Sequence, residues 1–118
     1  MKRALAVDDS ATMRNLVKIA LEAEGFTVDT AENGQEALEL TRRNSYDVII
    51  SDVNMPVMDG LQFLREFRST NRTTPFLMLT TETEAGKKEI AKKLGATGWI
   101  VKPFKPEDLV RVVKRVVR

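Results

Sequence analysis

The feature that most constrains the fold is a short run of β-branched residues, Val48-Ile49-Ile50, that is followed by a carboxylate. That carboxylate belongs to Asp52, and only Ser51 separates it from the run. A continuous apolar run of this kind suits a strand that is buried on both faces of a parallel sheet. A carboxylate at the end of such a strand lies at the rim of the sheet, where desolvation disfavours its charge unless cations or hydrogen-bond donors lie close to it. We therefore expect other parts of the chain to bring such groups to Asp52.

Apolar strand patterns alternate five times with helical patterns along the chain. The expected strands cover 4–7, 26–31, a segment from 46 to the acid at 52, 75–79 and 99–101, and the expected helices follow Ser10, Asn33 and Asp59, cover 84–94 and begin again at Pro106. This alternation predicts an α/β fold, a doubly wound five-stranded parallel sheet with helices on both faces. No linker or composition break divides the chain, so residues 1–118 are expected to form one domain.

The chain contains neither cysteine nor histidine, which excludes disulfides, thiol nucleophiles and imidazole bases. Any bound metal must then be held by oxygen atoms, which favours Mg²⁺, Ca²⁺ or Mn²⁺. Near the start, an apolar run of four residues is broken by Asp8-Asp9, so it is too short for a signal peptide or a membrane span. We expect a cytoplasmic protein without membrane contacts.

The formal net charge is only +2, but the last third of the chain is basic. From Lys87 to Arg118 there are ten lysine and arginine residues against three acidic ones. This pattern is typical either of solvated helix faces or of a docking surface for an acidic partner. Nucleic-acid binding is not expected, because these basic residues are not interleaved with aromatic side chains.

Polar side chains follow four of the five expected strands, and they are Asp8-Asp9, Asp52, Thr80 and Lys102. Each of them alone is most often a helix cap, a turn residue or a solvated lysine. In a doubly wound sheet, however, the carboxyl ends of all strands meet at one edge, so these groups should converge there. Two carboxylates about 4 Å apart repel each other by about 4 kcal/mol at an effective dielectric constant near 20.

Such a cluster needs cations. Lys102 supplies one positive charge, and Mg²⁺, with Mn²⁺ as the alternative, suits a site that has few carboxylates and several retained waters. A metal, an ammonium, a hydroxyl and a carboxylate nucleophile are together the groups that phosphoryl transfer requires.

The strand-end residues, together with Asn54-Met55-Pro56, Asp59-Gly60 and Lys102-Pro103, resemble the receiver domain of two-component response regulators. The resemblance covers the whole chain and is strongest to the single-domain chemotaxis type. It implies a flavodoxin-like sheet with the strand order 2-1-3-4-5.

The resemblance also implies the roles of individual residues. Asp52 matches the phosphoacceptor, which receives a phosphoryl group from a histidine kinase, and Thr80 and Lys102 match the residues that contact that group. The implied Mg²⁺ ligands are Asp9, Asp52, the main-chain carbonyl of Asn54 and, through a water molecule, Asp8.

Two further positions are implied by the resemblance. Trp99 occupies the place of an aromatic residue that acts with Thr80 as a conformational switch, and Pro103 follows a peptide bond that is cis in the family. The family usually has Tyr or Phe where this chain has Trp99, so the larger indole is expected to move inward less readily, and a core tryptophan is the alternative. Thr81 also departs from the family, because a small residue is common there.

The expected function is that of a single-domain response regulator that works as a signalling switch, not as an enzyme, and acts in chemotaxis. The expected partners are a histidine kinase and a flagellar motor switch protein or a phosphatase, and the chain is expected to be a monomer whose output is binding. The alternatives are a phosphorelay intermediate that passes the phosphoryl group to a histidine phosphotransfer domain, and an isolated receiver from a larger transcription factor. A dehalogenase-type phosphatase fits less well, because Asp8-Asp9-Ser10 lacks the spacing of its paired acids.

Overall fold

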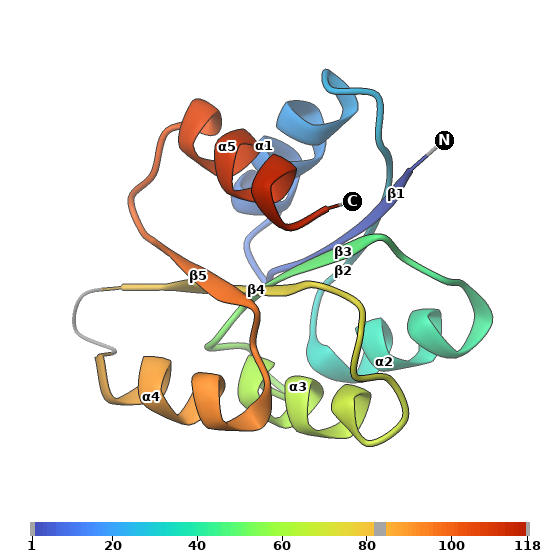
Figure 1. Cartoon of the computed structure of the whole chain (residues 1–118), viewed down its shortest axis with the longest axis vertical. Helices are drawn as coiled ribbons and strands as arrows, with labels where there is room; N and C mark the ends of the chain where they lie inside the picture. Colours follow the sequence, from blue (N-terminus) through green and yellow to red (C-terminus); the bar gives the residue numbers. More distant parts are fainter. Residues whose placement is uncertain (1, 82–84, 118) are drawn as a thin grey trace.

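The computed structural model describes residues 2–81 and 85–117, and these residues form one parallel sheet between two layers of helices (Figure 1). The strands are β1 (Arg3–Val7), β2 (Thr27–Ala31), β3 (Val48–Asp52), β4 (Phe76–Thr80) and β5 (Gly98–Val101), and the helices are α1 (Ala11–Glu22), α2 (Gly34–Arg43), α3 (Gly60–Arg68), α4 (Ala85–Leu94) and α5 (Pro106–Val116).

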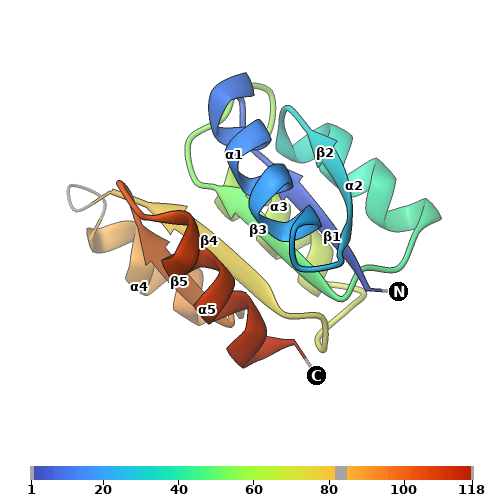
Figure 2. The same ribbon diagram turned by 90° about the horizontal axis from the view of Figure 1, so that it is seen from above.

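The strand order is β2-β1-β3-β4-β5, with every neighbouring pair parallel. Helices α1 and α5 cover one face of the sheet, and α2, α3 and α4 cover the other (Figure 1). Seen from above, the strands run side by side beneath α1 and α5 (Figure 2). The expected doubly wound fold is therefore confirmed. Within the described residues, none of the helices combines the length and the apolar character that crossing a bilayer would need.

The element boundaries differ from the expected ones by one or two residues. β3 begins at Val48 and not at Tyr46, because its ladder with β1 begins where Ala4 pairs with Val48. β4 extends to Thr80, which is completely buried, because Thr80 still pairs with Val101 of β5. Glu84, at which the fourth helix was expected to begin, lies outside the described residues.

Alternate residues of the central strands fill two separate cores. On the α2, α3 and α4 side the core includes Leu5, Val7, Ile49, Phe76 and Met78, and on the α1 and α5 side it includes Ala4, Ala6, Ile50, Leu77 and Leu79. Full burial of a side chain the size of leucine or phenylalanine stabilises the fold by about 1.5–3 kcal/mol. The three central strands are thereby held firmly from both faces, and so is the carboxyl edge at which they end.

The segment between β3 and α3 folds back onto the end of β3. Asp59 and Gln62 form a capping box at the start of α3, in which the Asp59 side chain accepts a hydrogen bond from the backbone amide of Gln62 at 2.8 Å. The amide of Gly60 donates to the Val53 carbonyl at 2.8 Å, and a Cβ atom at Gly60 would collide with the carbonyl oxygen of Asp52. Only glycine therefore allows this close approach, which places the segment over the end of β3.

Gly60→Ala is expected to lower the free energy of unfolding by about 2–4 kcal/mol, because the backbone must move away from Asp52. Gly86→Ala is the matched control, since Gly86 lies in α4 with open space around its Cα atom. That substitution should raise the free energy of unfolding by up to about 1 kcal/mol. Urea unfolding of both variants measures the difference, and equal effects would contradict the close approach.

Candidate functional site

Three carboxylates meet at the carboxyl edge of the sheet, as the sequence predicted. Asp8 and Asp9 follow β1, Asp52 ends β3, and one carboxylate oxygen from each lies within 4.8 Å of the others. Asp8 and Asp52 are buried, with 2% and 8% of their surface exposed, whereas Asp9 is exposed. The cluster is therefore set into the edge of the sheet and is open to solvent on the Asp9 side.

Lys102 brings an ammonium group into this cluster from the end of β5. Its Nζ atom lies 3.0 Å from Oδ1 of Asp52 and 3.5 Å from Oδ2 of Asp8. The backbone amide of Lys102 donates to the Thr80 carbonyl at 2.6 Å, and the peptide bond to Pro103 is cis. β1, β3 and β5 thus contribute charged side chains to one place.

The charges of this cluster are not balanced. Burial raises the pKa of both Asp52 and Asp8, and the nearby Lys102 offsets this only in part. Burial alone would lower the pKa of Lys102, but hydrogen bonding and attraction to Asp52 and Asp8 outweigh it, so its pKa is raised. One ammonium faces three carboxylates, so an additional cation would fit here.

Hydrogen bonds hold the two buried carboxylates in fixed orientations. Oδ1 of Asp52 accepts from the Val53 amide at 2.8 Å as well as from Lys102, and Oδ1 of Asp8 accepts from the Ser10 amide at 2.9 Å. Oδ1 of each of these two carboxylates is therefore held by a backbone amide.

Thr80 presents a polar atom that has no partner. Its Oγ1 atom is buried and, in the described part of the chain, it is the one buried side-chain oxygen or nitrogen without a hydrogen-bond partner. Leaving a buried hydroxyl unpaired costs about 1–3 kcal/mol, and such groups are often explained by a ligand or a functional role. Because Leu79 is paired with Asp52, Thr80 lies one residue beyond it at the same edge of the sheet.

Two residues at this edge were not predicted from the sequence. Lys87 of α4 donates to Oδ1 of Asn54 at 2.7 Å, and Arg14 of α1 donates to the main-chain carbonyl of Asp8 at 2.7 Å. Lys87 is one of four lysines in α4, so nothing in the sequence distinguishes it. Arg14 follows Asp8 by six residues, and only its place on the first turn of α1 could have suggested this contact.

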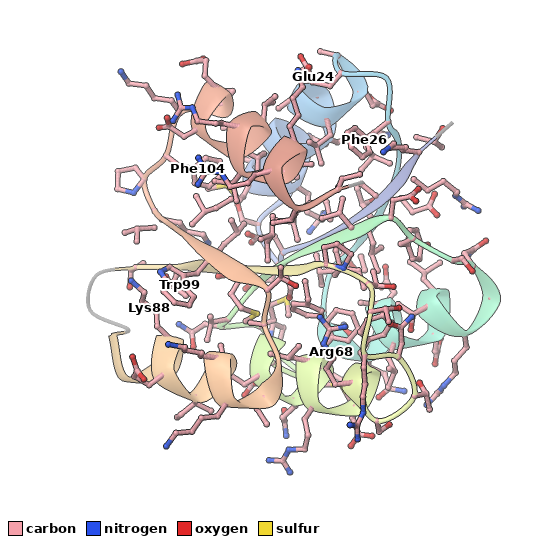
Figure 3. The ribbon with its side chains drawn as sticks, in the orientation of Figure 1. Glu24, Phe26, Arg68, Lys88, Trp99 and Phe104 are labelled. Atoms are coloured by element: carbon pink, nitrogen blue, oxygen red, sulfur yellow. The ribbon has the colours of Figure 1, made fainter. Side chains whose placement is uncertain are left out.

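Trp99 lies on β5, facing α4 (Figure 3). It is partly buried and packs against the core on the α2, α3 and α4 side. The ammonium of Lys88 lies 4.9 Å from the centroid of the indole ring, which is a cation–π contact. Trp99 is therefore neither a fully buried core residue nor a fully exposed one.

Asp52→Asn should stabilise the metal-free protein at pH 7 by about 1–3 kcal/mol, because it removes a buried charge. A raised pKa means that folding favours the protonated carboxyl group. The wild-type protein therefore has the full contribution below the unfolded-state pKa of 3.8 and loses it as the pH rises through the folded-state pKa. Urea unfolding with a chelator present, between pH 4 and 7, should show the advantage of the variant growing with pH. A constant difference would contradict this electrostatic origin.

Comparisons with known proteins identify relatives of this chain. The family model of the response regulator receiver domain matches residues 4–114. The transcriptional regulatory protein SrrA of Staphylococcus aureus is 41% identical over 114 residues, which are 97% of this chain and 47% of that protein. The chain thus spans about half the length of the curated relatives it matches.

Solved structures of receiver domains superpose on this chain over nearly its full length. The chemotaxis protein CheY4 of Vibrio cholerae has a TM-score of 0.93 and 50% sequence identity, with 99% of both chains covered. The receiver domain of NtrX from Brucella abortus has a TM-score of 0.91 and 29% identity, with 96% of both chains covered. With the match to the family model, these similarities show that the chain belongs to the response regulator receiver domain family.

Proposed function

We propose that this chain accepts a phosphoryl group on Asp52 from a histidine kinase, in a reaction that depends on Mg²⁺, and that it signals through the resulting change of conformation. Receiver domains generally interact with histidine kinases. The observation that carries the proposal is the pairing of Asp52 with Lys102 at 3.0 Å beside the unpartnered hydroxyl of Thr80. In this proposal the chain is a signalling switch and not an enzyme.

The donor atoms of the site fit Mg²⁺, which receiver domains generally bind. The three clustered carboxylates are hard oxygen ligands, and the chain has no histidine or cysteine that would favour a softer metal. Asp9, Asp52 and the main-chain carbonyl of Asn54 would hold the ion directly, and Asp8 would hold it through a water molecule. Mn²⁺ takes the same donors. When bound, the ion would neutralise the carboxylates and the oxygens of the incoming phosphoryl group.

The side chains of the protein would carry out the transfer itself. A carboxylate oxygen of Asp52 attacks the phosphorus of the kinase phosphohistidine, the P–N bond breaks, and its electron pair leaves with the imidazole ring. The Lys102 ammonium then moves its interaction from the carboxylate to the negative phosphoryl oxygens. The Thr80 hydroxyl gains the acceptor that it lacks.

We further propose that the switch acts in chemotaxis. The similarity to CheY4, at 50% identity over 99% of both chains, supports this role. The output would then be binding to a motor switch protein or a phosphatase through the basic surface of the last third of the chain. The second candidate is a receiver module of a transcriptional regulator, and it is supported by the 41% identity to SrrA.

Incubation with Mg²⁺ and acetyl phosphate should add one phosphoryl group to the protein, as measured by intact mass. Asp52→Asn should abolish the gain because the carboxylate nucleophile is absent, and a chelator should abolish it in the wild-type protein. Lys102→Met should reduce the uptake rate by about tenfold or more, the effect of losing one group that stabilises developing charge. A gain that persists in the Asp52→Asn variant would contradict the proposal.

Trp99 is the single tryptophan of the chain, so its fluorescence reports directly on the expected switch. Phosphorylation should change the emission, because inward movement of the ring would separate it from the Lys88 ammonium. In the Thr80→Ala variant the phosphoryl group should still be taken up, but the emission change should be lost. An unchanged emission in fully phosphorylated wild-type protein would show that Trp99 does not switch.

A further inference from the structure

The carboxyl ends of α3 and α4 border a hollow that is lined by basic side chains. Its volume is about 350 Å³, and the residues that line it are Arg68, Arg72, Lys93, Leu94 and Gly95. Arg68 ends α3, Arg72 follows in the loop before β4, and Lys93 lies in the last turn of α4. The lining therefore brings together three positive charges and no acidic residue.

This hollow is separate from the carboxylate cluster. It lies on the side of the sheet that α3 and α4 cover, where Arg68 is found (Figure 3). Arg72 precedes β4 and Gly95 precedes β5, so both lie where these strands begin, whereas Asp52 lies at the edge where parallel strands end. A ligand in the hollow would therefore bind away from the phosphoryl site.

The guanidinium group of Arg68 is held in place by contacts from both helix ends. Its Nε atom donates to the carbonyl of Gly95 at 3.0 Å, and its Nη1 atom donates to the carbonyl of Asn71 at 3.2 Å. Its Cζ atom lies 5.6 Å from the ring centroid of Phe67 and 6.0 Å from that of Phe76. Because the group is already ordered, a ligand that interacts with it pays little additional entropy.

None of the three cations is neutralised by a neighbouring acid. Within residues 2–81 and 85–117, neither Arg68 nor Arg72 nor Lys93 forms an ion pair with a carboxylate. Arg68 is partly buried, and burial lowers its pKa, because part of the guanidinium is withdrawn from water. Buried arginine and lysine side chains are normally paired, so an anion would supply a partner that the protein does not.

The two helix ends account for only part of this positive charge. The carbonyl groups at the carboxyl end of a helix carry a partial negative charge of about half a unit, which nearby cations stabilise. The ends of α3 and α4 would therefore offset about one of the three charges, and about two would remain. Capping of helices thus explains Arg68, whose guanidinium binds loop carbonyls, but not Arg72 and Lys93 as well.

We propose that this hollow is a binding site for a small phosphate-bearing anion, which Arg72 and Lys93 contact directly and whose charge Arg68 stabilises. A phosphate group carries a charge of about −1.5 to −2 at neutral pH, which matches the charge that remains. The planar donors of arginine also fit phosphate oxygens, and lysine adds a point charge. Among the described residues that line the hollow none is aromatic, so the phosphate and not a stacked base would be recognised. The inference goes beyond the proposed function and does not depend on phosphorylation of Asp52.

The test is a titration of metal-free protein with inorganic pyrophosphate at constant ionic strength, followed by NMR. The backbone amide of Gly95 and the Nε–H of Arg68 should shift and saturate, with a dissociation constant of about 1 mM or lower. Without metal, the carboxylates around Asp52 repel anions, so that edge should not respond. Citrate, a polyanion without phosphate, should bind more weakly.

Two pairs of variants separate the hollow from general attraction to a basic surface. Arg72→Gln and Lys93→Gln should each weaken pyrophosphate binding about fivefold or more, because each removes a charged donor from the hollow. The matched controls are Arg65→Gln and Lys92→Gln, which remove the same charges from exposed positions of α3 and α4 outside the lining. The controls should change the affinity less than about twofold, because salt screens charges that do not contact the ligand.

Thermal unfolding provides a second readout. A ligand that binds only the folded protein raises its Tm, so pyrophosphate should raise the Tm of the wild-type protein and of both controls, and this gain should be lost in Arg72→Gln and Lys93→Gln. The inference would be overturned by unshifted resonances of Gly95 and Arg68, by equal losses of affinity in the variants and their controls, or by citrate binding as tightly as pyrophosphate.

Discussion

The ion pair between Lys102 and Asp52 offsets part of the repulsion among the three carboxylates that meet at this edge of the sheet. Asp52 ends the central strand of the order β2-β1-β3-β4-β5, so its neighbours on either side are β1 and β4. That position gives Asp52 both its burial and its partners, since Asp8 arrives from the end of β1 and Thr80 from the end of β4. Lys102 must come from one strand further away, and its amide is attached to the Thr80 carbonyl at 2.6 Å. The fold therefore places the buried carboxylate of Asp52 and the ammonium of Lys102 at the same edge, but this one ammonium does not neutralise all three carboxylates.

The fold, and the residues that form the site, could be predicted from the sequence because of the topology of the sheet. In a parallel sheet, residues that end different strands meet, whatever their separation in the chain, so Asp8, Asp9, Asp52 and Lys102 could be grouped before any geometry was known. The β-branched run before Asp52 was sufficient to identify a strand buried on both faces, and β3 is buried throughout. The ends of strands were less predictable, because pairing with a neighbour and not residue preference decides them, as Thr80 shows.

Contacts made by long side chains could not be predicted in the same way. Lys87 reaches Asn54 and Lys88 reaches Trp99, although both lysines belong to the same run of charged residues. Which lysine faces the site depends on the rotation of α4 about its axis, and the thin apolar pattern of that helix fixes the rotation poorly. The small number of buried apolar side chains in α4 also affects how firmly the helix is held. A helix with one completely buried side chain among those described costs little to displace, so it is suited to respond to events at Asp52.

The unpartnered hydroxyl of Thr80 bears on how large such a response can be. An acceptor supplied to this hydroxyl would recover about 1–3 kcal/mol, and a coupling free energy of that size changes a two-state equilibrium by about 5- to 150-fold. Conversion from 1% to 99% of an active conformer needs about 5.5 kcal/mol, so Thr80 alone is not sufficient. In the proposed function the remainder would come from other contacts of the phosphoryl group, such as the one with Lys102, whose pKa is raised because hydrogen bonding and attraction to Asp52 and Asp8 outweigh its burial. Thr80 ends β4 and Lys102 directly follows β5, the two strands that lie beyond β3 on the side away from β1. Trp99 belongs to β5 and contacts Lys88 of α4. A rearrangement of Thr80 and Lys102 would therefore be transmitted to Trp99 and α4.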